Sequence, residues 1–478
     1  MELVIILLAL SLLMFVAYRG FSVILFAPIF ALFAVFLTEP SFVLPFFSNI
    51  FMEKMVGFIK LYFPVFLLGA IFGKVVEMSG IADSIAKTII EIVGEKRTIL
   101  AIVLMGAVLT YSGVSVYVVV FAIYPFAAKL FRQANIPKRL IPGTIVLGAV
   151  TFTMDALPGS PQIQNVIPTT FFKTDIYAAP ILGIIGAIFV LTLGLIYLES
   201  RRKKAKEARE GYFGFEDGNS EMAASLELEQ KNHTSLQSIK ISRVQQVVAF
   251  VPLILVGVMN KFFTITIPKW YPNGFDFSSI GMKSFGKIEL SAVLGIWSVE
   301  LALIIGIITT LLLYWKRVVT GFQAGLNTSG GALLATMNTG AEFGFGGVIA
   351  ALPGFAIMRD SISATFTNPL VNGAVTTNIL AGITGSASGG MGIVLSTMGD
   401  KFIAAAEQYH IPLEVMHRIV SMASGGMDTL PHNGAIITIL TVTGLTHKQS
   451  YRDIFAVTIL KTVAVFLVIA FYTFTGIY

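Results

Sequence analysis

The chain has 478 residues, of which 55% are hydrophobic and 13% are charged, and its formal net charge is +6. A soluble protein of this length needs more charge to cover its surface, so the composition excludes an ordinary soluble globular protein. Cysteine is absent, which excludes disulfides, thiol catalysis and cysteine-ligated metals.

Ten apolar segments follow one another along the chain, as expected for a bundle of membrane-spanning helices. They are 3–16, 21–37, 58–76, 140–167, 179–198, 244–258, 290–313, 333–357, 413–440 and 454–472. The first lacks the basic start and the cleavage site of a signal peptide, so we expect a retained span. The sequence therefore predicts an all-α polytopic membrane protein.

Two further apolar stretches, 98–130 and 374–404, are each interrupted midway by small polar residues. The pieces on either side are shorter than the roughly 20 residues that a spanning helix needs, so we expect two re-entrant helix–turn–helix hairpins. The first tip reads Thr110-Tyr111-Ser112-Gly113-Val114-Ser115. The second tip reads Thr384-Gly385-Ser386-Ala387-Ser388-Gly389-Gly390.

The segment 199–243 is polar and opens with a run of lysines and arginines. Basic loops are typical of the cytoplasmic side of a membrane, so we expect this segment to be a cytoplasmic linker. Basic residues also flank the first hairpin, which predicts entry from the cytoplasm, whereas the second hairpin has no basic excess and should enter from outside. Both termini then lie outside.

The two sides of the linker resemble each other. Met154-Asp155-Ala156-Leu157-Pro158 matches Met427-Asp428-Thr429-Leu430-Pro431 at an offset of 428 − 155 = 273 residues, and the two tips align at an offset of 384 − 110 = 274. Each half, 1–198 and 244–478, contains five predicted spans and one hairpin. An odd number of crossings inverts the second half, so the sequence predicts two inverted repeats of the kind that secondary transporters use.

Two of the spans, 140–167 and 413–440, are predicted to be broken helices. The first break reads Asp155-Ala156-Leu157-Pro158-Gly159-Ser160-Pro161-Gln162-Ile163-Gln164-Asn165. The second break reads Asp428-Thr429-Leu430-Pro431-His432-Asn433-Gly434. Proline and glycine interrupt a helix, and irregular backbone inside a membrane has to be buried in protein or line a water-filled cavity.

The candidate site lies between the two tips and the two breaks. Serine hydroxyls and free N–H groups at a helix start suit a carboxylate, which points to Ser112, Gly113, Ser115, Ser386, Ser388 and Gly389. Side chains for a hydroxyl or keto oxygen of a substrate are Gln162, Asn165, His432 and Asn433. Asn338, Thr339 and Glu342 are weaker candidates to line the same cavity, and His417 is expected at the membrane interface.

Asp155 and Asp428 fall in the middle of predicted spans, where a carboxylate is costly and therefore a functional candidate. Each either carries a coupling proton or caps the broken helix by accepting N–H bonds. His432 is the other proton candidate, because its unperturbed pKa lies near neutrality. The sequence holds no hydrolase, metalloprotease or Walker motif, so we expect no enzyme activity, no cofactor and no resident metal, and transport driven by an ion gradient.

Through the stretches 153–165 and 424–435, the chain resembles the gluconate permease (GntP) family of the ion transporter superfamily. The resemblance implies proton-coupled uptake of a small organic anion across a bacterial cytoplasmic membrane. It also implies a homodimer with a scaffold domain and a substrate-carrying domain that moves like an elevator. Pro158-Gly159-Ser160-Pro161-Gln162 stands where sugar-acid members carry a histidine- and proline-rich sequence, so the chain looks more like the branch associated with 3-hydroxybutyrate.

Other functions stay open at the level of sequence. Gluconate or another sugar acid is the alternative substrate, and sodium is the alternative coupling ion, because tip hydroxyls and carbonyls suit it as well. A cation/proton antiporter would use Asp155 and Asp428 as ion ligands without an organic substrate. A receptor or channel is the remaining class. The expected partners are the substrate, the coupling ion, membrane lipid and a second subunit, and no nucleic acid.

Overall fold

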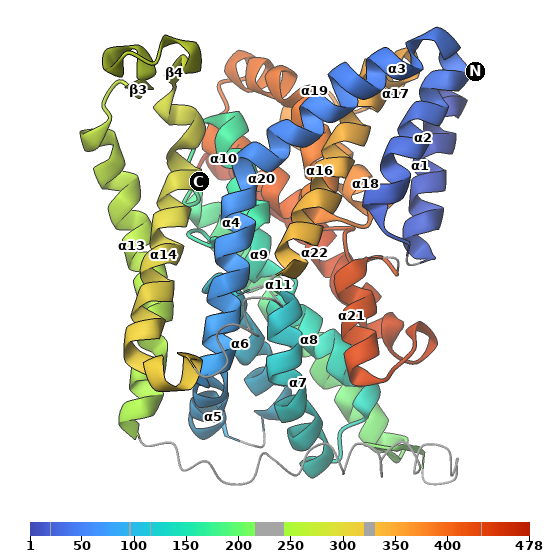
Figure 1. Ribbon diagram of the computed structural model, residues 1–478. Helices are drawn as coiled ribbons and strands as arrows, with labels where there is room; N and C mark the ends of the chain where they lie inside the picture. The colour runs from blue at the N-terminus through green and yellow to red at the C-terminus, as the bar shows by residue number, and fades with distance from the viewer. Residues whose placement is uncertain (20, 95–96, 115, 216–242, 320–329, 432) are drawn as a thin grey trace.

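The computed structural model of the protein describes residues 1–19, 21–94, 97–114, 116–215, 243–319, 330–431 and 433–478. These residues are almost entirely helical, which confirms the prediction of an all-α polytopic membrane protein (Figure 1). Strands of the described residues form two short antiparallel pairs, β1 (Glu210–Gly211) with β2 (Gly214–Phe215) and β3 (Phe275–Asp276) with β4 (Lys287–Ile288).

The first half of the chain contains three long helical segments, a short amphipathic helix, a hairpin, a broken helix and a final long helix. They are, in order, α1 (Glu2–Tyr18), α2 (Val23–Thr38), α3 (Val43–Pro45) leading into α4 (Met52–Ser79), α5 (Ile81–Val93), the hairpin α6 (Thr98–Tyr111) and α7 (Val116–Gln133), the broken helix α8 (Ile141–Ala149), α9 (Phe152–Asp155) and α10 (Ile163–Phe172), and α11 (Pro180–Glu207).

The second half repeats this order of elements. It runs through α13 (Arg243–Trp270), α14 (Leu290–Val319), α16 (Gly330–Ala351), the short α17 (Pro353–Thr365), the hairpin α18 (Pro369–Thr384) and α19 (Ala387–Gln408), the broken helix α20 (Leu413–Ser424) and α21 (Gly434–Thr443), and α22 (His447–Thr475). Both hairpins and both broken helices therefore lie within a few residues of the segments that the sequence indicates.

Local sequence explains the two hairpin turns. After α6, Gly113 adopts a φ of 94°, and after α18, Gly385 adopts a φ of 65°. Only glycine visits this left-handed region routinely, so each tip turns where a glycine stands. Ser386 then starts α19 as its N-cap, because its hydroxyl accepts a hydrogen bond from the Gly389 N–H at 3.1 Å.

Two predicted spans have different boundaries in the structure. The span expected at 58–76 belongs to a continuous helical segment from Pro40 to Ser79, which begins with a 3-10 turn and a π-helical turn, η2 (Phe46–Phe51). The span expected at 333–357 divides at Leu352, where α16 ends and Pro353 begins α17. A proline suits the first position of a helix but not its interior, which explains the division.

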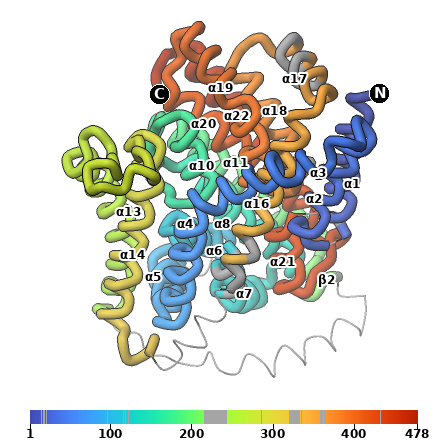
Figure 2. The backbone as a smooth tube through the Cα atoms, turned by 45° about the horizontal axis from the view of Figure 1, so that its top comes forward, coloured from blue at the N-terminus to red at the C-terminus, as the bar shows by residue number. Residues whose placement is uncertain are grey.

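Five helical segments among the described residues are long and apolar enough to cross a membrane. They are Pro40–Ser79, Pro180–Glu207, Arg243–Trp270, Leu290–Val319 and His447–Thr475. Helices α13 and α14 pack together along one flank of the molecule in both views (Figures 1 and 2). In the centre, α16 packs on α2, α4 and α19, while α11 packs on α22.

A charge cluster joins the ends of α11 and α22 to the segment before α8. The Asp453 carboxylate is buried, and it accepts hydrogen bonds from Arg201 Nε at 2.7 Å, Arg139 Nη1 at 3.2 Å and the Tyr197 hydroxyl at 2.9 Å. Arg139 also pairs with Glu210. This cluster lies at the same end of the molecule as the basic start of the predicted linker.

Candidate functional site

The first tip is held against the first break. Gln162, just before α10, donates hydrogen bonds from Nε2 to the carbonyl oxygens of Thr110 at 2.7 Å and Val114 at 3.1 Å. The Tyr111 hydroxyl donates to the Pro158 carbonyl at 2.7 Å. A Cβ atom on Gly113 would lie 3.1 Å from Pro161 Cγ, so the tip backbone packs directly on the break.

The second tip is held against the second break in a corresponding way. Asn433 Nδ2 donates a hydrogen bond to the Gly385 carbonyl at 2.9 Å. The Oδ1 atom of the same side chain accepts from the Ile436 N–H at 3.0 Å and so caps α21. One amide side chain therefore joins tip to break in each half, although Gln162 and Asn433 do not align at the offset of the repeat.

The two breaks meet at a buried lysine on α22. Lys461 is 3% exposed, and its ammonium lies 3.0 Å from Asp428 Oδ1 and 3.9 Å from Asp155 Oδ2. It also donates a hydrogen bond to the Val150 carbonyl at 2.9 Å, between α8 and α9. The two repeat-related aspartates thus share one cation.

Glycine allows this close approach. A Cβ atom on Gly425 would collide with Oδ2 of Asp155, and one on Gly426 would collide with Oδ1 of Asn378. The Gly425-Gly426 pair before Asp428 therefore serves a packing function: it lets α20 end directly against the carboxylate of the other half. A side chain at Gly425 would push the two breaks apart, and one at Gly426 would displace Asn378 of α18.

A second buried cation, Arg418 on α20, organises the backbone around the first break. It is fully buried, and it donates hydrogen bonds to the carbonyl oxygens of Ala178 at 2.8 Å and Asp155 at 3.1 Å and to Asn165 Oδ1 at 2.9 Å. Asn165 Nδ2 donates to the Ser160 and Ile176 carbonyls. The Asn165 side chain is therefore bonded on both its oxygen and its nitrogen within the protein.

His417, which the sequence predicts at the membrane interface, lies inside the protein. It is fully buried, with Nδ1 2.6 Å from the Thr174 hydroxyl and Nε2 3.3 Å from Asn165 Oδ1. Helix α20 packs on α10 and α19, so protein covers His417, and its depth in the membrane stays a prediction.

The remaining predicted residues are divided between the two tips. The Ser112 hydroxyl donates to the Val108 carbonyl at 2.6 Å, and the Ser386 and Ser388 hydroxyls lie 3.4 Å apart. Ser115 and His432 lie outside the described residues. The structure therefore brings each tip to the break of its own half, and it brings the two breaks together through Lys461.

Glu342, on α16, lies beside the start of α19. It is 4% exposed, and a Cβ atom on Gly389 would collide with its Oε2. Asn338, one turn earlier on α16, instead accepts hydrogen bonds from the Ser22 hydroxyl at 3.1 Å and the Ile24 N–H at 3.0 Å. Of these two candidate lining residues, Glu342 is the one beside a tip.

The sequence analysis did not single out Lys461 and Arg418, although a signal was present. Each is a lone cation inside an apolar segment, and a charge at membrane depth is costly enough to indicate a function or a partner. Neither has an equivalent cation in the other half: Ile188 stands 461 − 188 = 273 residues before Lys461. The search for repeated motifs therefore did not reveal them.

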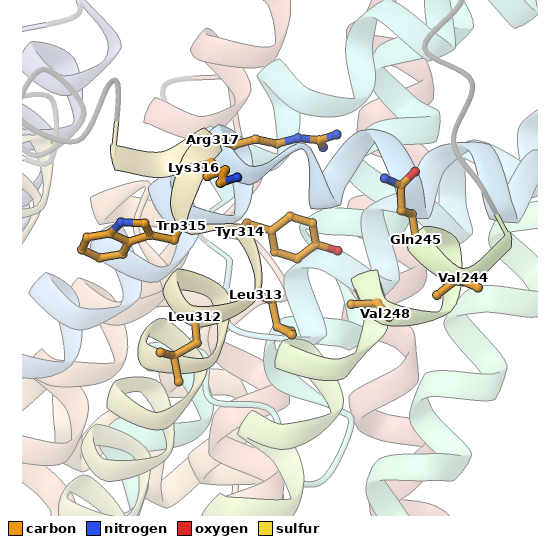
Figure 3. Close-up of a pocket in the computed structure, with 9 residues that line it drawn as sticks. All are labelled: Val244, Gln245, Val248, Leu312, Leu313, Tyr314, Trp315, Lys316 and Arg317. Carbon is orange, nitrogen blue, oxygen red and sulfur yellow. The ribbon is translucent and has the colours of Figure 1, made fainter.

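A surface recess of about 480 Å³ lies away from this site, between the ends of α13 and α14 (Figure 3). Its lining includes Gln245, Tyr314, Trp315 and Lys316. Tyr314 departs from helical backbone angles there, with φ −125° and ψ 24°. Within the described part of the chain, no cluster of three or more histidines, aspartates and glutamates has the arrangement of a metal site.

Long apolar helices, two hairpins and two broken helices around buried charges define a multi-pass membrane transporter. The chain matches the GntP family permease model over residues 1–298, and it belongs to that family. It is a permease and not an enzyme.

Individual relatives agree with this assignment. The chain is 70% identical to the uncharacterized transporter YxjC of Bacillus subtilis over the full length of both proteins. It is 32% identical over 125 residues to an uncharacterized transporter of Haemophilus influenzae, which covers 26% of this chain and 29% of the relative. The crystal structure of the YdaH transporter of Alcanivorax borkumensis, described as having an unusual topology, shares the fold with a TM-score of 0.55, at 15% identity and over 89% and 88% of the two chains.

Proposed function

We propose that this permease is a proton-coupled symporter of a short hydroxy- or keto-monocarboxylate, such as 3-hydroxybutyrate. It works in a bacterial cytoplasmic membrane as a homodimer of two-repeat subunits, with the hairpins and broken helices moving across the membrane against the other helices.

The observation that carries the proposal is that helices begin at the tips and breaks of both halves. Helices α10, α19 and α21 all begin there, after Gln162, Ser386 and Asn433. The first N–H groups of a helix lack partners within it, and the positive end of its dipole favours an anion. Four charged residues lie nearby, the acidic Asp155 and Asp428 and the basic Lys461 and Arg418. Their formal charges sum to zero, so they do not oppose the attraction of an anion to the helix starts.

The amide side chains at the same position support recognition of a hydroxyl or keto oxygen. Gln162 and Asn433 already bind tip carbonyls, so a substrate held between tip and break would contact groups from both. The sequence analysis also included Asn165 among these groups. Its side-chain oxygen and nitrogen both bond to protein groups, so in this proposal Asn165 supports the first break and does not bind the substrate.

The test is uptake by the purified protein in liposomes. Labelled 3-hydroxybutyrate is supplied under an imposed pH gradient without sodium, with unlabelled gluconate as competitor. Uptake that follows the gradient and resists gluconate supports the proposal. Uptake blocked by gluconate favours a sugar acid, and uptake that requires sodium favours sodium coupling.

Serine variants test the place of binding. Ser386→Ala and Ser112→Ala should each reduce uptake at least tenfold while the protein stays folded, because each removes a hydroxyl at a tip. Ser279→Ala, in the exposed loop between β3 and β4, is the matched control and should transport like the unchanged protein. Normal uptake by both tip variants would contradict binding at the tips, and proton flux without any organic acid would favour an antiporter.

A further inference from the structure

Glu342 places a buried carboxyl group at the N-terminus of α19. Ser386 is the N-cap of this helix and Gly389 is its third residue. The Glu342 Oε2 atom lies against Gly389 Cα, in the space that a Cβ atom would fill, and the Ser386 side chain interacts with the same carboxyl group. Within the part of the chain that the structure describes, Oε2 itself has no hydrogen-bond partner.

Small residues bring α16 and α19 together at this point. A Cβ atom on Gly392 would collide with the Phe343 ring, and one on Gly346 would lie against Ile393. With Gly389, these glycines let the backbones of the two helices approach closely. The Glu342 carboxyl is therefore packed into a helix–helix contact and not directed toward solvent.

Among the described residues, no cation compensates the Glu342 carboxyl. It is the single charged residue of α16, and neither α2 nor η2 carries a titratable side chain. On α4, the Tyr62 hydroxyl bonds to α10, and Lys54 lies exposed beside Gly347. The other charged residues of α4 (Glu53, Lys60, Lys74 and Glu77) form no ion pair with it.

The remaining neighbours of α16 are α19 and α17. On α19, the charged residues Asp400, Lys401 and Glu407 begin 11 positions after Gly389, which is about 16 Å along a helix. On α17, the side chains of Arg359 and Asp360 lie outside the described residues. A lone buried carboxyl with these neighbours has two favourable states: it is neutral, or it is ionised and stabilised by the free N–H groups at the start of α19.

We propose that Glu342 carries the co-transported proton, and that its ionised carboxylate competes with the substrate's carboxylate for the N-terminus of α19. This inference rests on the proposed function, and it differs from the sequence analysis, which had assigned the proton to Asp155, Asp428 or His432. Asp155 and Asp428 share Lys461, whereas Glu342 has no such counter-charge.

The competition links proton and anion in a fixed ratio. Two carboxylates at one helix start repel each other, so the substrate anion binds when Glu342 is protonated. The pair then enters as one proton and one anion, with no net charge. Without substrate, the ionised Glu342 carboxylate takes the place of the substrate's carboxylate at the start of α19, so the empty transporter can move back and complete the cycle.

The decisive variant is Glu342→Gln, which keeps the shape of the side chain but cannot ionise. Binding of 3-hydroxybutyrate to the unchanged protein should weaken about tenfold per pH unit above the titration of Glu342, because one proton is linked to binding. In Glu342→Gln, binding should not depend on pH. Accumulation driven by a pH gradient should fall to equilibration, while exchange of internal for external 3-hydroxybutyrate should persist.

Glu300→Gln is the matched control. Glu300 also lies within a spanning helix, α14, but it is only partly buried and belongs to neither α16 nor α19, so accumulation should persist in this variant. If Glu342→Gln does not fold, Glu342→Asp replaces it: this variant can still ionise, and its binding should keep the tenfold slope. Accumulation by Glu342→Gln equal to that of the unchanged protein, or a lost slope in Glu342→Asp, would overturn the inference and leave the proposed function standing.

A separate measurement covers failure of the proposed function. If the unchanged protein accumulates neither 3-hydroxybutyrate nor gluconate, the substrate class is wrong. Infrared difference spectra between two pH values then decide on Glu342, since a protonated carboxyl group gives its own carbonyl-stretch band. Loss of a titrating band in Glu342→Gln but not in Glu300→Gln supports proton binding at Glu342, and an unchanged band overturns it.

Discussion

Single residues at the centre of this transporter show how a charge can be kept at membrane depth. Lys461 lies between Asp428 and Asp155 and also bonds to the Val150 carbonyl. Buried charges are tolerated when they are paired and hydrogen-bonded. Both aspartates lie within 4 Å of the same ammonium group, so each depends on Lys461.

Lys461→Met should therefore destabilise the protein by about 3–5 kcal/mol, the usual cost of leaving a buried charge without its partner. The measurement is unfolding in mixed detergent micelles. Lys448→Met, at an exposed position of the same helix, is the control and should change stability by less than about 0.5 kcal/mol. Adding Asp428→Asn to Lys461→Met should recover part of the loss, and a Lys461→Met protein of full stability would show that the aspartates are neutral without it.

Gly425→Ala tests the contact between the two breaks. The added Cβ would collide with the Asp155 carboxylate, so we expect a loss of about 1–3 kcal/mol, typical of overpacking, and reduced transport. Gly257→Ala is the matched control on α13, where nothing lies within 4 Å of the added atom. The same unfolding measurement applies, and equal stability of the two variants would mean that the breaks can separate at little cost.

At the scale of elements, both hairpin tips are largely buried, and polar contacts join each of them to a break. Gln162 holds the first tip with two hydrogen bonds, and Asn433 holds the second with one. A hydrogen bond contributes about 1 kcal/mol, so these bonds add to the packing that closes each tip. Opening a tip as a gate requires both the bonds and the packing to be given up.

Gln162→Ala should release the first tip selectively. Both bonds to the Thr110 and Val114 carbonyls are lost, so amide hydrogen exchange in 110–116 should become at least about tenfold faster. Exchange in 384–390 should stay unchanged. Gln133 is exposed at the end of α7, so Gln133→Ala is the control and should leave exchange at both tips unchanged. If the first tip stays protected from hydrogen exchange in Gln162→Ala, packing by Pro161 and Leu303 closes it instead.

The sequence predicts these elements well where composition changes within an apolar run. Small polar residues mark both tips, and proline with glycine marks both breaks, because they act through the local backbone. The sequence analysis missed two boundaries. Nothing local separates Pro40–Phe51 from an ordinary loop, so tertiary packing decides that boundary, whereas Pro353 is a local signal that the apolar run around it concealed.

The side-chain partners were harder to predict than the elements. The repeated M-D-x-L-P motif identifies Asp155 and Asp428, but their common partner is Lys461, about 30 residues after the second motif and without an equivalent in the first half. Asn165 and His417 were equally hard to predict. Asn165 on α10 contacts His417 and Arg418 on α20, which lie some 250 residues away in the chain. Sequence spacing does not report contacts of this kind.

On the scale of the whole molecule, the repeated order of elements makes a prediction about orientation. Each half has three helical segments, a short helix, a hairpin, a broken helix and a last long helix. One charge cluster joins the end of α11, the first turns of α22 and the segment before α8, so these lie on one side of the molecule. The cluster consists of Asp453, Arg201, Arg139 and Glu210. Basic residues indicate that this side is cytoplasmic. The β3–β4 loop, at the opposite end of α13 from Arg243, should then face outward (Figure 1).

Because the chain has no cysteine, single cysteines can be introduced to test this orientation without removing any native residue of that type. Ser279→Cys, in the exposed β3–β4 loop, should react with a membrane-impermeant maleimide in intact cells. Lys204→Cys, exposed near the end of α11, should react only after the membrane is permeabilised. The opposite labelling pattern would reverse the whole topology. The second hairpin and the Glu342 contact with α19 would then open toward the cytoplasm. Labelling of both cysteines in intact cells would contradict a linker on the inner side.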